Sequence, residues 1–369
     1  MNIRSDRTEF EPTLAAMRER IAAVRPDDYS RTRNQIDGAV TRLSPYLTHG
    51  FISLPGLLAA LRQFHPIEDD HKLVYELGWR EFFHHVWRHS GDAIFTSLHE
   101  GPLPDAAYRT ELPADIRRGA TGVPAIDAAV RTLYATGWLH NHARMWLASY
   151  VVHLRRTHWR AGADWLYGHL LDGDLASNHL SWQWVAGTGS TKPYLFNAEN
   201  VARYAPPSWH SPGSVIDTSY DTLERIARGA HPPSAGGGQA VDEPPLLHLP
   251  PAGLTQTDTT PLANAWLAHP WALGEPLPGQ RAVGVFLADF HRRWAWSERR
   301  WRFVATRMAA LGTLPVWCES AVPASASARA ESHLGERLAP AALSPVPRLF
   351  AERGRSYASF TQFWRAAQS

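Results

Sequence analysis

Residues 172–184 read DGDLASNHLSWQW, a composition that differs from that of a plain core helix of leucine and alanine. At about 100° per residue, Asp174, Asn178 and Trp182 fall on one helical face, which joins a carboxylate, an amide and an indole. Such a stripe favours a polar aromatic ligand over an apolar core. Trp184 follows Trp182 by two positions and projects to another side, so we expect this helix to serve two neighbouring sites.

The composition is that of a water-soluble globular protein. The chain has 369 residues, 44% of them hydrophobic and 20% charged. No apolar run approaches the roughly 20 residues of a membrane span, and the charged N-terminal sequence lacks the apolar core of a signal peptide. We therefore expect a cytoplasmic protein with no membrane partner, and a chain of this length predicts two units.

Cysteine and histidine usage excludes several kinds of site. The single cysteine, Cys318, excludes a disulfide framework and any four-cysteine zinc or iron-sulfur site. His140 and His142 are two apart, a poor spacing for one metal, and HExxH is absent, so no metal site is expected. Redox chemistry would need an organic cofactor. The net charge of +2 does not predict nucleic-acid binding, although basic surface can be local.

Hydrophobic periodicity divides the chain. From Phe10 to about Gly229, segments such as LVYELGWREFFHHVW and VPAIDAAVRTLYATG repeat apolar residues at three and four, which is typical of helices. The proline- and glycine-rich segment AHPPSAGGGQAVDEPP then interrupts all regular patterns. We predict an all-helical domain over residues 1–230, a linker over 231–245 and a small α/β domain over 246–369.

The segment after the linker alternates between strand and helix patterns. AVGVFLAD is predicted as a buried strand, residues 297–311 as a helix and LPVWCES as a second strand. SARAESHLGERL is predicted as a helix and VPRLFAE as a third strand. This alternation indicates a small α/β domain, so the predicted fold class is mainly α with an α/β C-terminal domain.

The segment TRLSPYLTHG, residues 41–50, has the pattern of a helix start. Ser44 precedes Pro45 as an N-cap precedes a proline at the first helical position. Free backbone amides there favour a phosphate, and Thr41 and Arg42 add donors. The alternative is an ordinary capped helix.

Two further segments combine polar and aromatic side chains. In YELGWREFFHHVW, Glu76, Trp79 and Arg80 share one helical face, and the simpler interpretation is a solvated ion pair beside a half-buried tryptophan. In GWLHNHARM, Asn141 and Met145 lie on one face. GxSxG, GxGxxG and GxxxxGK[ST] are missing, so no motif supports a hydrolase or a nucleotide phosphatase.

Taken together and in this order, TRLSPYL, ELGWREF, GWLHNHARM and DGDLASNHLSWQW resemble the motifs of the flavin domain of the photolyase and cryptochrome family. The resemblance implies an all-helical domain that holds FAD bent into a U, with a cavity leading from the surface to the flavin. It places Asn178 at flavin N5 and Arg144 in a pair with Asp172 over the flavin ring. The cofactor-binding positions that it implies are Tyr29, Thr41, Leu43, Ser44, Asn141, Arg144, Asp172, Gly173, Asp174 and Asn178.

The resemblance also implies an electron path and a substrate pocket. Trp182 matches the electron donor nearest the flavin and Trp159 the next one, whereas the third tryptophan maps to Ala106. We hypothesise a shortened or rerouted path through Tyr108 or Trp146. The substrate and DNA positions that it implies are Arg33, Glu76, Trp79, Arg80, Asn141, His142, Met145 and Trp184. The implied catalytic positions are Glu76, Asn178, Trp182 and Trp159.

Two details refine the resemblance. Asn141 directly after His140, with Met145 at the end of the motif, favours the cyclobutane-dimer type over the (6-4) type, which has a second histidine there. Relatives carry an α/β antenna domain before the flavin domain, whereas here the α/β unit follows. Because its end, SYASFTQFWRAA, looks like the segment that closes that antenna domain, we predict a reduced antenna-like unit with a parallel sheet; its second chromophore is unknown.

Arginine and tryptophan alternate in FHRRWAWSERRWRF, residues 290–303. Such a segment can bind single-stranded nucleic acid or a chromophore by stacking. The favoured interpretation is an amphipathic helix that packs its tryptophans inward and solvates its arginines.

The resemblance predicts a light-driven deoxyribodipyrimidine photo-lyase, a monomer that acts on UV-damaged DNA. Excited, reduced FAD would donate an electron to a flipped pyrimidine dimer and recover it after the ring splits. The alternative is a cryptochrome-like blue-light photoreceptor without repair activity, and a third possibility is a structural DNA-binding flavoprotein.

Overall fold

The computed structural model describes residues 10–231, 236–276, 279–351 and 354–368, and its first part is helical. The α-helices of this part are α1 (Leu14–Ala22), α2 (Pro26–Thr32), α3 (Ser44–Thr48), α4 (Leu54–Arg62), α5 (Lys72–Ser90), α6 (Ala114–Arg117), α7 (Pro124–Thr136), α8 (Asn141–Ser149), α9 (Trp159–His169), α10 (Leu175–Ala186), α11 (Ala198–Tyr204) and α12 (Tyr220–Ala227). Short 3-10 turns are η1 (Gly91–Phe95), η2 (Asp105–Ala107) and η4 (Pro207–Trp209), and α8 continues into one π turn, η3 (Tyr150–Leu154). None of the described helices combines the length and apolar character that a membrane-spanning segment requires.

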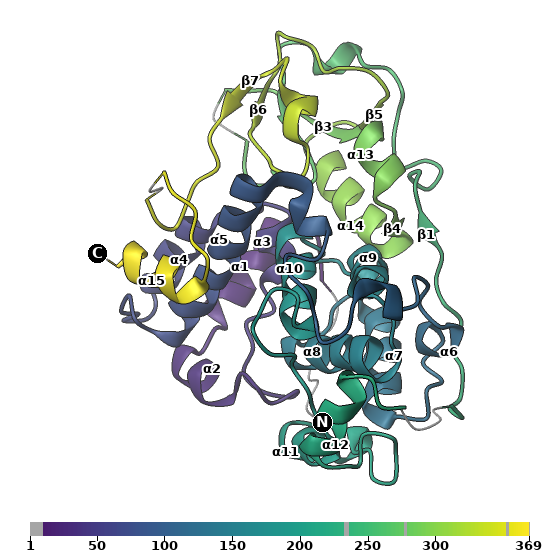
Figure 1. Cartoon of the computed structure of the whole chain (residues 1–369). Coiled ribbons are helices and arrows are strands. Elements are labelled where there is room, and N and C mark those ends of the chain that lie inside the picture. Colours follow the sequence, from purple (N-terminus) through teal and green to yellow (C-terminus); the bar gives the residue numbers. More distant parts are fainter. Residues whose placement is uncertain (1–9, 232–235, 277–278, 352–353, 369) are drawn as a thin grey trace, which may run out of the picture.

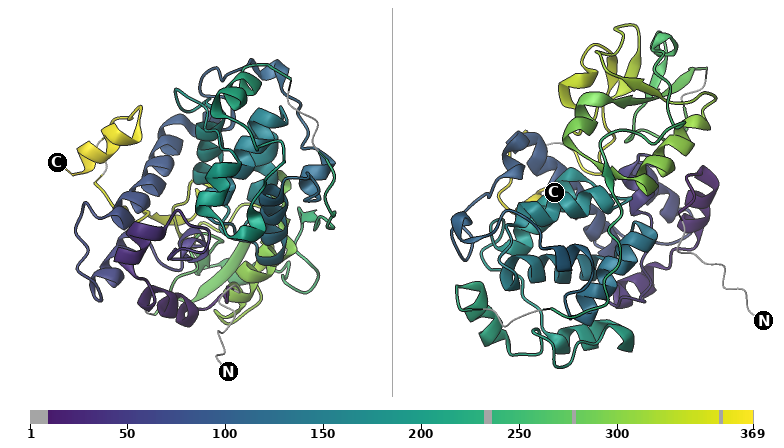
Figure 2. Two further views of the ribbon diagram at one scale, coloured as in Figure 1. Left: turned by 90° about the horizontal axis from the view of Figure 1, so that it is seen from below. Right: turned by 90° about the vertical axis from the view of Figure 1, so that its right-hand side faces the viewer.

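The second part, which we call the α/β region, spans residues 246–344 and lies over one end of the helices (Figures 1 and 2). Its strands are β1 (Leu246–Leu247), β2 (Trp266–Ala268), β3 (Ala282–Leu287), β4 (Trp296–Ser297), β5 (Val316–Cys318), β6 (Ser327–Arg329) and β7 (Ala342–Ser344). Its helices are α13 (Ala288–Arg293) and α14 (Glu298–Ala309), with 3-10 turns η5 (Thr260–Leu262) and η6 (Gly335–Leu338). The fold is therefore helical with a small α/β region.

Five strands form a parallel sheet in the order β5-β3-β2-β6-β7. Counted along the chain, this is the order 3-2-1-4-5 of a doubly wound sheet. The residues of β2 and β5 are buried throughout, as the continuous apolar strands of a parallel sheet should be. The predicted parallel sheet is thus present, while its relation to an antenna domain stays a prediction.

Two elements predicted in the α/β region are wrong. Residues 327–338 are not one helix but β6, a loop and the short 3-10 turn η6, which begins at Gly335 with a left-handed φ of 53°. Residues 346–351 are not a strand in the described part of the chain. Pro345 and Pro347 cannot donate to a ladder, so the last strand, β7, ends before them.

The linker and the C-terminal segment both run back along the helical part. Residues 232–235 of the predicted linker lie outside the described residues. Further on, Val241 N–H donates to the Arg118 carbonyl (2.8 Å), and Glu243 accepts from Trp165 Nε1 (3.2 Å). The last helix, α15 (Phe360–Ala367), packs on α5, where a Cβ on Gly78 would lie 2.7 Å from the Trp364 ring (Figure 1).

Tryptophans of the α/β region fill the core between the sheet and the helices. Trp294, Trp296 and Trp301 are at most 6% exposed and belong to the same apolar cluster as residues of α3 and α10. Arg302 pairs with Glu298, and Arg293 pairs with Asp92 (2.9 Å). The tryptophans therefore pack inward, as favoured. The segment is not one helix, however, because it spans α13, β4 and α14, and Arg300 is buried (0% exposed) and not solvated.

Buried neutral histidines make the fold sensitive to acid. Burial lowers the pKa of His153 and of His269 to about 4, whereas an unfolded chain titrates its imidazoles near pH 6.5. Between these values the unfolded state binds more protons, so stability falls as the pH falls. We expect each group to lower the free energy of unfolding by about 2 kcal/mol between pH 7 and pH 5.

Denaturant titration of His153→Gln at pH 7 and pH 5 checks this expectation. Between pH 7 and pH 5, the free energy of unfolding of this variant should fall by about 2 kcal/mol less than that of wild type, because a glutamine amide does not titrate. His99→Gln is the control, since His99 is exposed and should keep the wild-type dependence. Equal pH dependence in His153→Gln and wild type would contradict the assignment.

Candidate functional site

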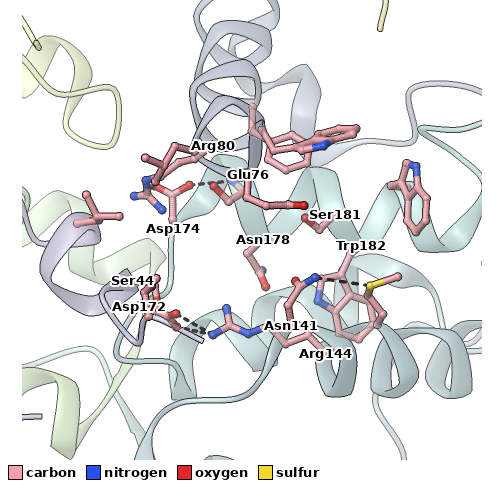
Figure 3. Close-up of a pocket in the computed structure, with 18 of the residues that line it drawn as sticks. Ser44, Glu76, Arg80, Asn141, Arg144, Asp172, Asp174, Asn178, Ser181 and Trp182 are labelled. Atoms are coloured by element: carbon pink, nitrogen blue, oxygen red, sulfur yellow. Dashed lines mark hydrogen bonds and ion pairs between the residues drawn. The ribbon is translucent and has the colours of Figure 1, made fainter. Parts of the chain in front are cut away.

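A cavity of about 440 Å³ opens between α2, α3, α5, α8 and α10, within the size range of ligand pockets (Figure 3). Of the positions predicted for a cofactor or substrate, those that line it are Tyr29, Thr41, Ser44, Glu76, Trp79, Arg80, Asn141, Arg144, Met145, Asp172, Asp174, Asn178, Trp182 and Trp184. Most of the positions predicted from the sequence therefore lie together in one cavity. Apolar lining residues that were not predicted include Leu57, Leu61, Leu73, Leu77, Phe83, Leu166 and Val185.

One face of α10 forms a wall of this cavity. Asp174 is the N-cap of the helix, and its Oδ1 accepts a hydrogen bond from Ser177 N–H (2.8 Å). The polar stripe continues through Asn178 to Trp182, with Ser177 and Ser181 at helical spacings that the prediction did not include. Asn178 Nδ2 donates to the Ala163 carbonyl (2.8 Å), so its Oδ1 is the amide atom available to a ligand.

The two tryptophans of α10 line the same cavity. Trp182 is 2% exposed and lies inside, whereas Trp184 is 39% exposed. Trp182 rests on α9 at Gly162, where a Cβ would lie 2.3 Å from the indole. The cavity is therefore closed to solvent at Trp182 and open to solvent at Trp184.

Asp172 and Arg144 form the first of two ion pairs in the cavity. Arg144 Nη2 lies 2.9 Å from Oδ1 and 2.7 Å from Oδ2 of Asp172, and Arg144 Nε donates to the Leu139 carbonyl (2.8 Å). Thr48 Oγ1 donates to the Asp172 carbonyl (3.2 Å). Because the Asp172 side chain is only 2% exposed, Arg144 is the cation that makes its burial possible.

Asp174 forms the second ion pair, on the other side of Asn178 (Figure 3). Its Oδ2 accepts from Arg80 Nη2 (3.1 Å) and His84 Nε2 (2.9 Å). Burial alone would raise the pKa of Asp174, but the charge of Arg80 and the hydrogen bond from His84 outweigh it and hold that pKa well below its usual value. Sequence analysis missed His84, although it lies one turn after Arg80.

Asp174 and Arg80 also border a second cavity of about 320 Å³. It lies between the helical part and the carboxyl ends of β2 and β6, and it is also lined by Trp271, Arg329, Glu331 and His333. One carboxylate therefore stands in the wall between the two cavities.

Two predicted cofactor positions lie outside the lining of the first cavity. The Leu43 side chain is 1% exposed and belongs to the core, and Gly173 lies behind the cavity against Arg300. The predicted N-cap is also displaced by one residue, because Leu43 holds the cap position and Ser44 begins α3. The Ser44 hydroxyl instead accepts from Trp138 Nε1 (3.1 Å).

The mouth of the cavity carries the predicted substrate positions of α5 and α8. Glu76 pairs with Lys72 (3.0 Å) and Arg33 (3.4 Å), and Asn141 Nδ2 lies 3.7 Å from Met145 Sδ. The Trp79 ring stacks on Phe360 of α15, with ring centroids 4.0 Å apart.

Arg33 and His142 do not line the cavity. Arg33 approaches it through Glu76, whereas the His142 ring stacks on Tyr204 (4.7 Å) and its Nδ1 contacts the Asn34 carbonyl (2.9 Å).

Trp159, the other predicted catalytic position, is absent from the lining of this cavity. It is 2% exposed, it begins α9, and its Nε1 donates to Ser97 Oγ (3.1 Å). The next ring toward Tyr108 is His158, which lies 5.6 Å from Trp159 and 6.4 Å from Tyr108.

The residues present fit a flavin nucleotide better than a metal ion. The cavity joins an apolar wall to fixed carboxylate, guanidinium and amide groups, and Ser177 Oγ is buried without a hydrogen-bond partner among the described residues. No cluster of three potential metal ligands occurs in the described part of the chain. Asp172, Arg144 and Asn178 are the groups that would hold the flavin ring system.

Comparisons with known proteins identify relatives of the part of the chain that supplies most of the cavity's lining residues. Residues 73–208 match the family described as the FAD binding domain of DNA photolyase. A deoxyribodipyrimidine photo-lyase of Streptomyces griseus is 39% identical over 171 residues, which cover 45% of this chain and 36% of the relative. A cryptochrome DASH of Idiomarina loihiensis is 34% identical over 188 residues, covering 48% of this chain and 42% of the relative.

A solved cryptochrome of Synechocystis sp. PCC6803 superposes with a TM-score of 0.45 and 29% identity, covering 52% of this chain and 42% of that one. The chain spans only about a third to a half of the length of the curated relatives that it matches. Residues 73–208, which carry the ion pairs and the amide described above, thus match the FAD binding domain of DNA photolyase, and FAD is the cofactor that this match indicates.

Proposed function

We propose that the protein is a light-driven repair enzyme for cyclobutane pyrimidine dimers in DNA. The observation that carries this proposal is the pair of indoles, Trp79 and Trp184, which line the same cavity as the flavin-holding Asp172 and Asn178. When bound in its reduced form, FAD supplies the electron that light transfers to a dimer, and it recovers the electron after the ring splits.

The protein's own residues bind and orient the dimer. A base pair inside a duplex cannot reach a cavity, so the dimer must be flipped out and stacked, and a lesion with weakened pairing is the least costly to flip. The Trp79 ring stacks on Phe360, which fixes it at the cavity where a base would stack. Asn141 and Glu76 supply polar groups at the mouth, and Met145 an apolar one.

Cations around the mouth suit the DNA backbone. Arg33 and Lys72 both lie beside Glu76, and their side chains are 25% and 32% exposed. Phosphate contacts of this kind make affinity fall steeply with salt. Arg80 is committed to Asp174, so we propose that it positions the cofactor side of the cavity more than it binds phosphate.

A cryptochrome-like photoreceptor is the second candidate, because relatives named cryptochrome DASH match this chain as well as relatives named photo-lyases. A photoreceptor needs the flavin wall of α10 but not an accessible indole pair. Trp184, 39% exposed at the cavity, is the residue that separates the two candidates.

Repair of a defined lesion tests the proposal. The FAD-loaded protein is chemically reduced and illuminated with an oligonucleotide that carries one cyclobutane dimer, and the restored pyrimidines are measured by chromatography. We expect Trp184→Ala to lower the repair rate at limiting DNA by at least tenfold, because base stacking on an indole contributes about 1–3 kcal/mol.

Tyr220→Ala is the matched control, since Tyr220 is also exposed (46%) but does not line the cavity. It should repair at the wild-type rate. Absence of dimer repair by the reduced, FAD-loaded wild type would favour the photoreceptor, and repair of a (6-4) lesion alone would show that the lesion assignment is wrong.

A further inference from the structure

Arg300 of α14 is a charged side chain that the fold buries completely, with 0% exposed. The described residues include no ion pair to it, and burial lowers the pKa of its guanidinium, against the opposing effect of Tyr167 and Asp172. A buried cation without a direct carboxylate partner is costly, so its contacts should explain why it is there.

Both hydrogen bonds that the Arg300 guanidinium donates go to residues 167–173, the segment that leads into Asp172 and Asp174. Its Nη2 donates to the Gly173 carbonyl (2.6 Å) and its Nη1 to the Tyr167 carbonyl (3.2 Å). The guanidinium lies 4.1 Å from the centre of the Trp296 ring and 4.8 Å from that of Tyr167. Arg300 therefore joins the end of α9 to the turn before α10.

The close approach of Arg300 leaves no room for a side chain at Gly173. A Cβ at this position would lie 2.5 Å from Arg300 Nη1 and 2.6 Å from the Tyr167 carbonyl oxygen, distances that real side chains do not adopt. The residue between Asp172 and Asp174 is thus a glycine because the arginine approaches from behind. The two carboxylates point forward into the cavity from the same backbone that Arg300 holds (Figure 3).

His333 contacts the same segment two residues after Gly173, at Leu175. It lies in the connection between β6 and β7, and its Nε2 accepts from Leu175 N–H, the first residue of α10 (3.2 Å). Its Nδ1 donates to Glu331 (2.7 Å), and its ring stacks on Trp271 (4.4 Å). The imidazole is therefore fixed on three sides and cannot turn away from the helix start.

We propose that Arg300 and His333 are positioning residues of the flavin site, through which the α/β region sets the Asp172 and Asp174 carboxylates. The α/β region then contributes to FAD binding directly, whether or not it binds a second chromophore. This inference rests on FAD binding and not on DNA repair, so a negative repair assay leaves it intact.

Arg300→Met tests the proposal because it keeps the side-chain volume approximately and removes both hydrogen bonds. In the full-length protein, we expect the dissociation constant for FAD to rise at least tenfold and the midpoint potential of the bound flavin to shift. The constant is measured by flavin fluorescence during titration of the flavin-free protein. Arg300→Lys should recover part of the affinity, since an ammonium can reach one of the two carbonyls.

Arg307→Met is the matched control from the same helix. Arg307 is 8% exposed and also donates to two carbonyls, those of Leu273 (2.9 Å) and Gly274 (3.0 Å), but these belong to the α/β region. This variant should lower the thermal stability as Arg300→Met does. Its dissociation constant for FAD should stay within twofold of wild type, and the midpoint potential of its bound flavin should not shift.

Gly173→Ala approaches the same contact from the other side and keeps the test valid if Arg300→Met fails to fold. We expect it to weaken FAD binding with Arg300 intact. Wild-type affinity and potential in Arg300→Met, or in Gly173→Ala where the former is insoluble, would overturn the proposal. An equal loss of affinity in Arg307→Met would also overturn it, because it would indicate general destabilisation.

Discussion

Replacement of Arg144 by alanine is expected to raise the dissociation constant for FAD at least 100-fold. Asp172 would remain 2% exposed without the cation that contacts both of its oxygens, and breaking a buried pair in this way costs about 3–5 kcal/mol. The carboxylate would then take up a proton or turn from the cavity, and either change removes the anion that faces the flavin. Titration of the flavin-free variant with FAD measures the loss.

Arg155→Ala separates this effect from a loss of stability. Arg155 forms an equally close pair with Asp115 (2.6 Å and 3.1 Å), and neither residue lines the cavity. The variant should unfold at lower denaturant concentration and bind FAD as wild type does. Asp172→Asn, which removes the charge but keeps the side-chain shape, should partly restore the stability of Arg144→Ala. Normal FAD binding by Arg144→Ala would show that the pair does not set the site.

The parts of this site that lie on one helix could be predicted from the sequence. Asp174, Asn178 and Trp182 are separated by single turns of α10, so their common face follows from helical geometry alone. The same reasoning put Trp184 on another side of the helix, yet both indoles line one cavity. Periodicity gives a face of a helix but not the width of the cavity that it borders.

The groups that hold the carboxylates could not be predicted in this way. Arg300 and His333 reach the turn at Gly173 from a segment more than a hundred positions later, and no periodic pattern links them. The local sequence placed Arg300 in an amphipathic segment with solvated arginines and His333 in a helix, and neither interpretation linked these residues to Gly173. The SARAESHLGERL segment repeats apolar residues as a helix does, whereas its strand, β6, has three residues and depends on pairing with β2 and β7.

The position of α15 shows the same dependence on tertiary structure. Its sequence, SYASFTQFWRAA, only resembled the segment that closes an antenna domain, yet Phe360 stacks on Trp79, and Trp364 fits against Gly78. Residues of the α/β region therefore lie behind Asp172 and Asp174, whereas α15, which follows that region, lies behind Trp79.

Trp182→Phe is expected to slow photoreduction of the protein by at least 100-fold while repair by chemically reduced protein stays normal. The indole lines the flavin cavity and is the oxidisable ring closest to Asn178 on α10, and phenylalanine does not give up an electron comparably. Bleaching of the flavin absorbance under blue light, with an external thiol as the final reductant, measures the rate. Loss of repair as well would contradict the separation between activation and catalysis.

Beyond Trp159, the structure favours Tyr108 over Trp146 as the exit of this path. Tyr108 is half-buried and follows Trp159 through the His158 ring, whereas Trp146 is fully buried and its Nε1 is held by Asn200 (3.0 Å). Oxidation of a tyrosine releases its phenolic proton, so an exit near solvent suits it. We expect Tyr108→Phe to lower the photoreduction rate about tenfold and to abolish the tyrosyl signal in transient absorption, and Trp146→Phe to change neither. Slow photoreduction in Trp159→Phe together with wild-type rates in both other variants would mean that the thiol reduces the oxidised Trp159 directly, without Tyr108 or Trp146.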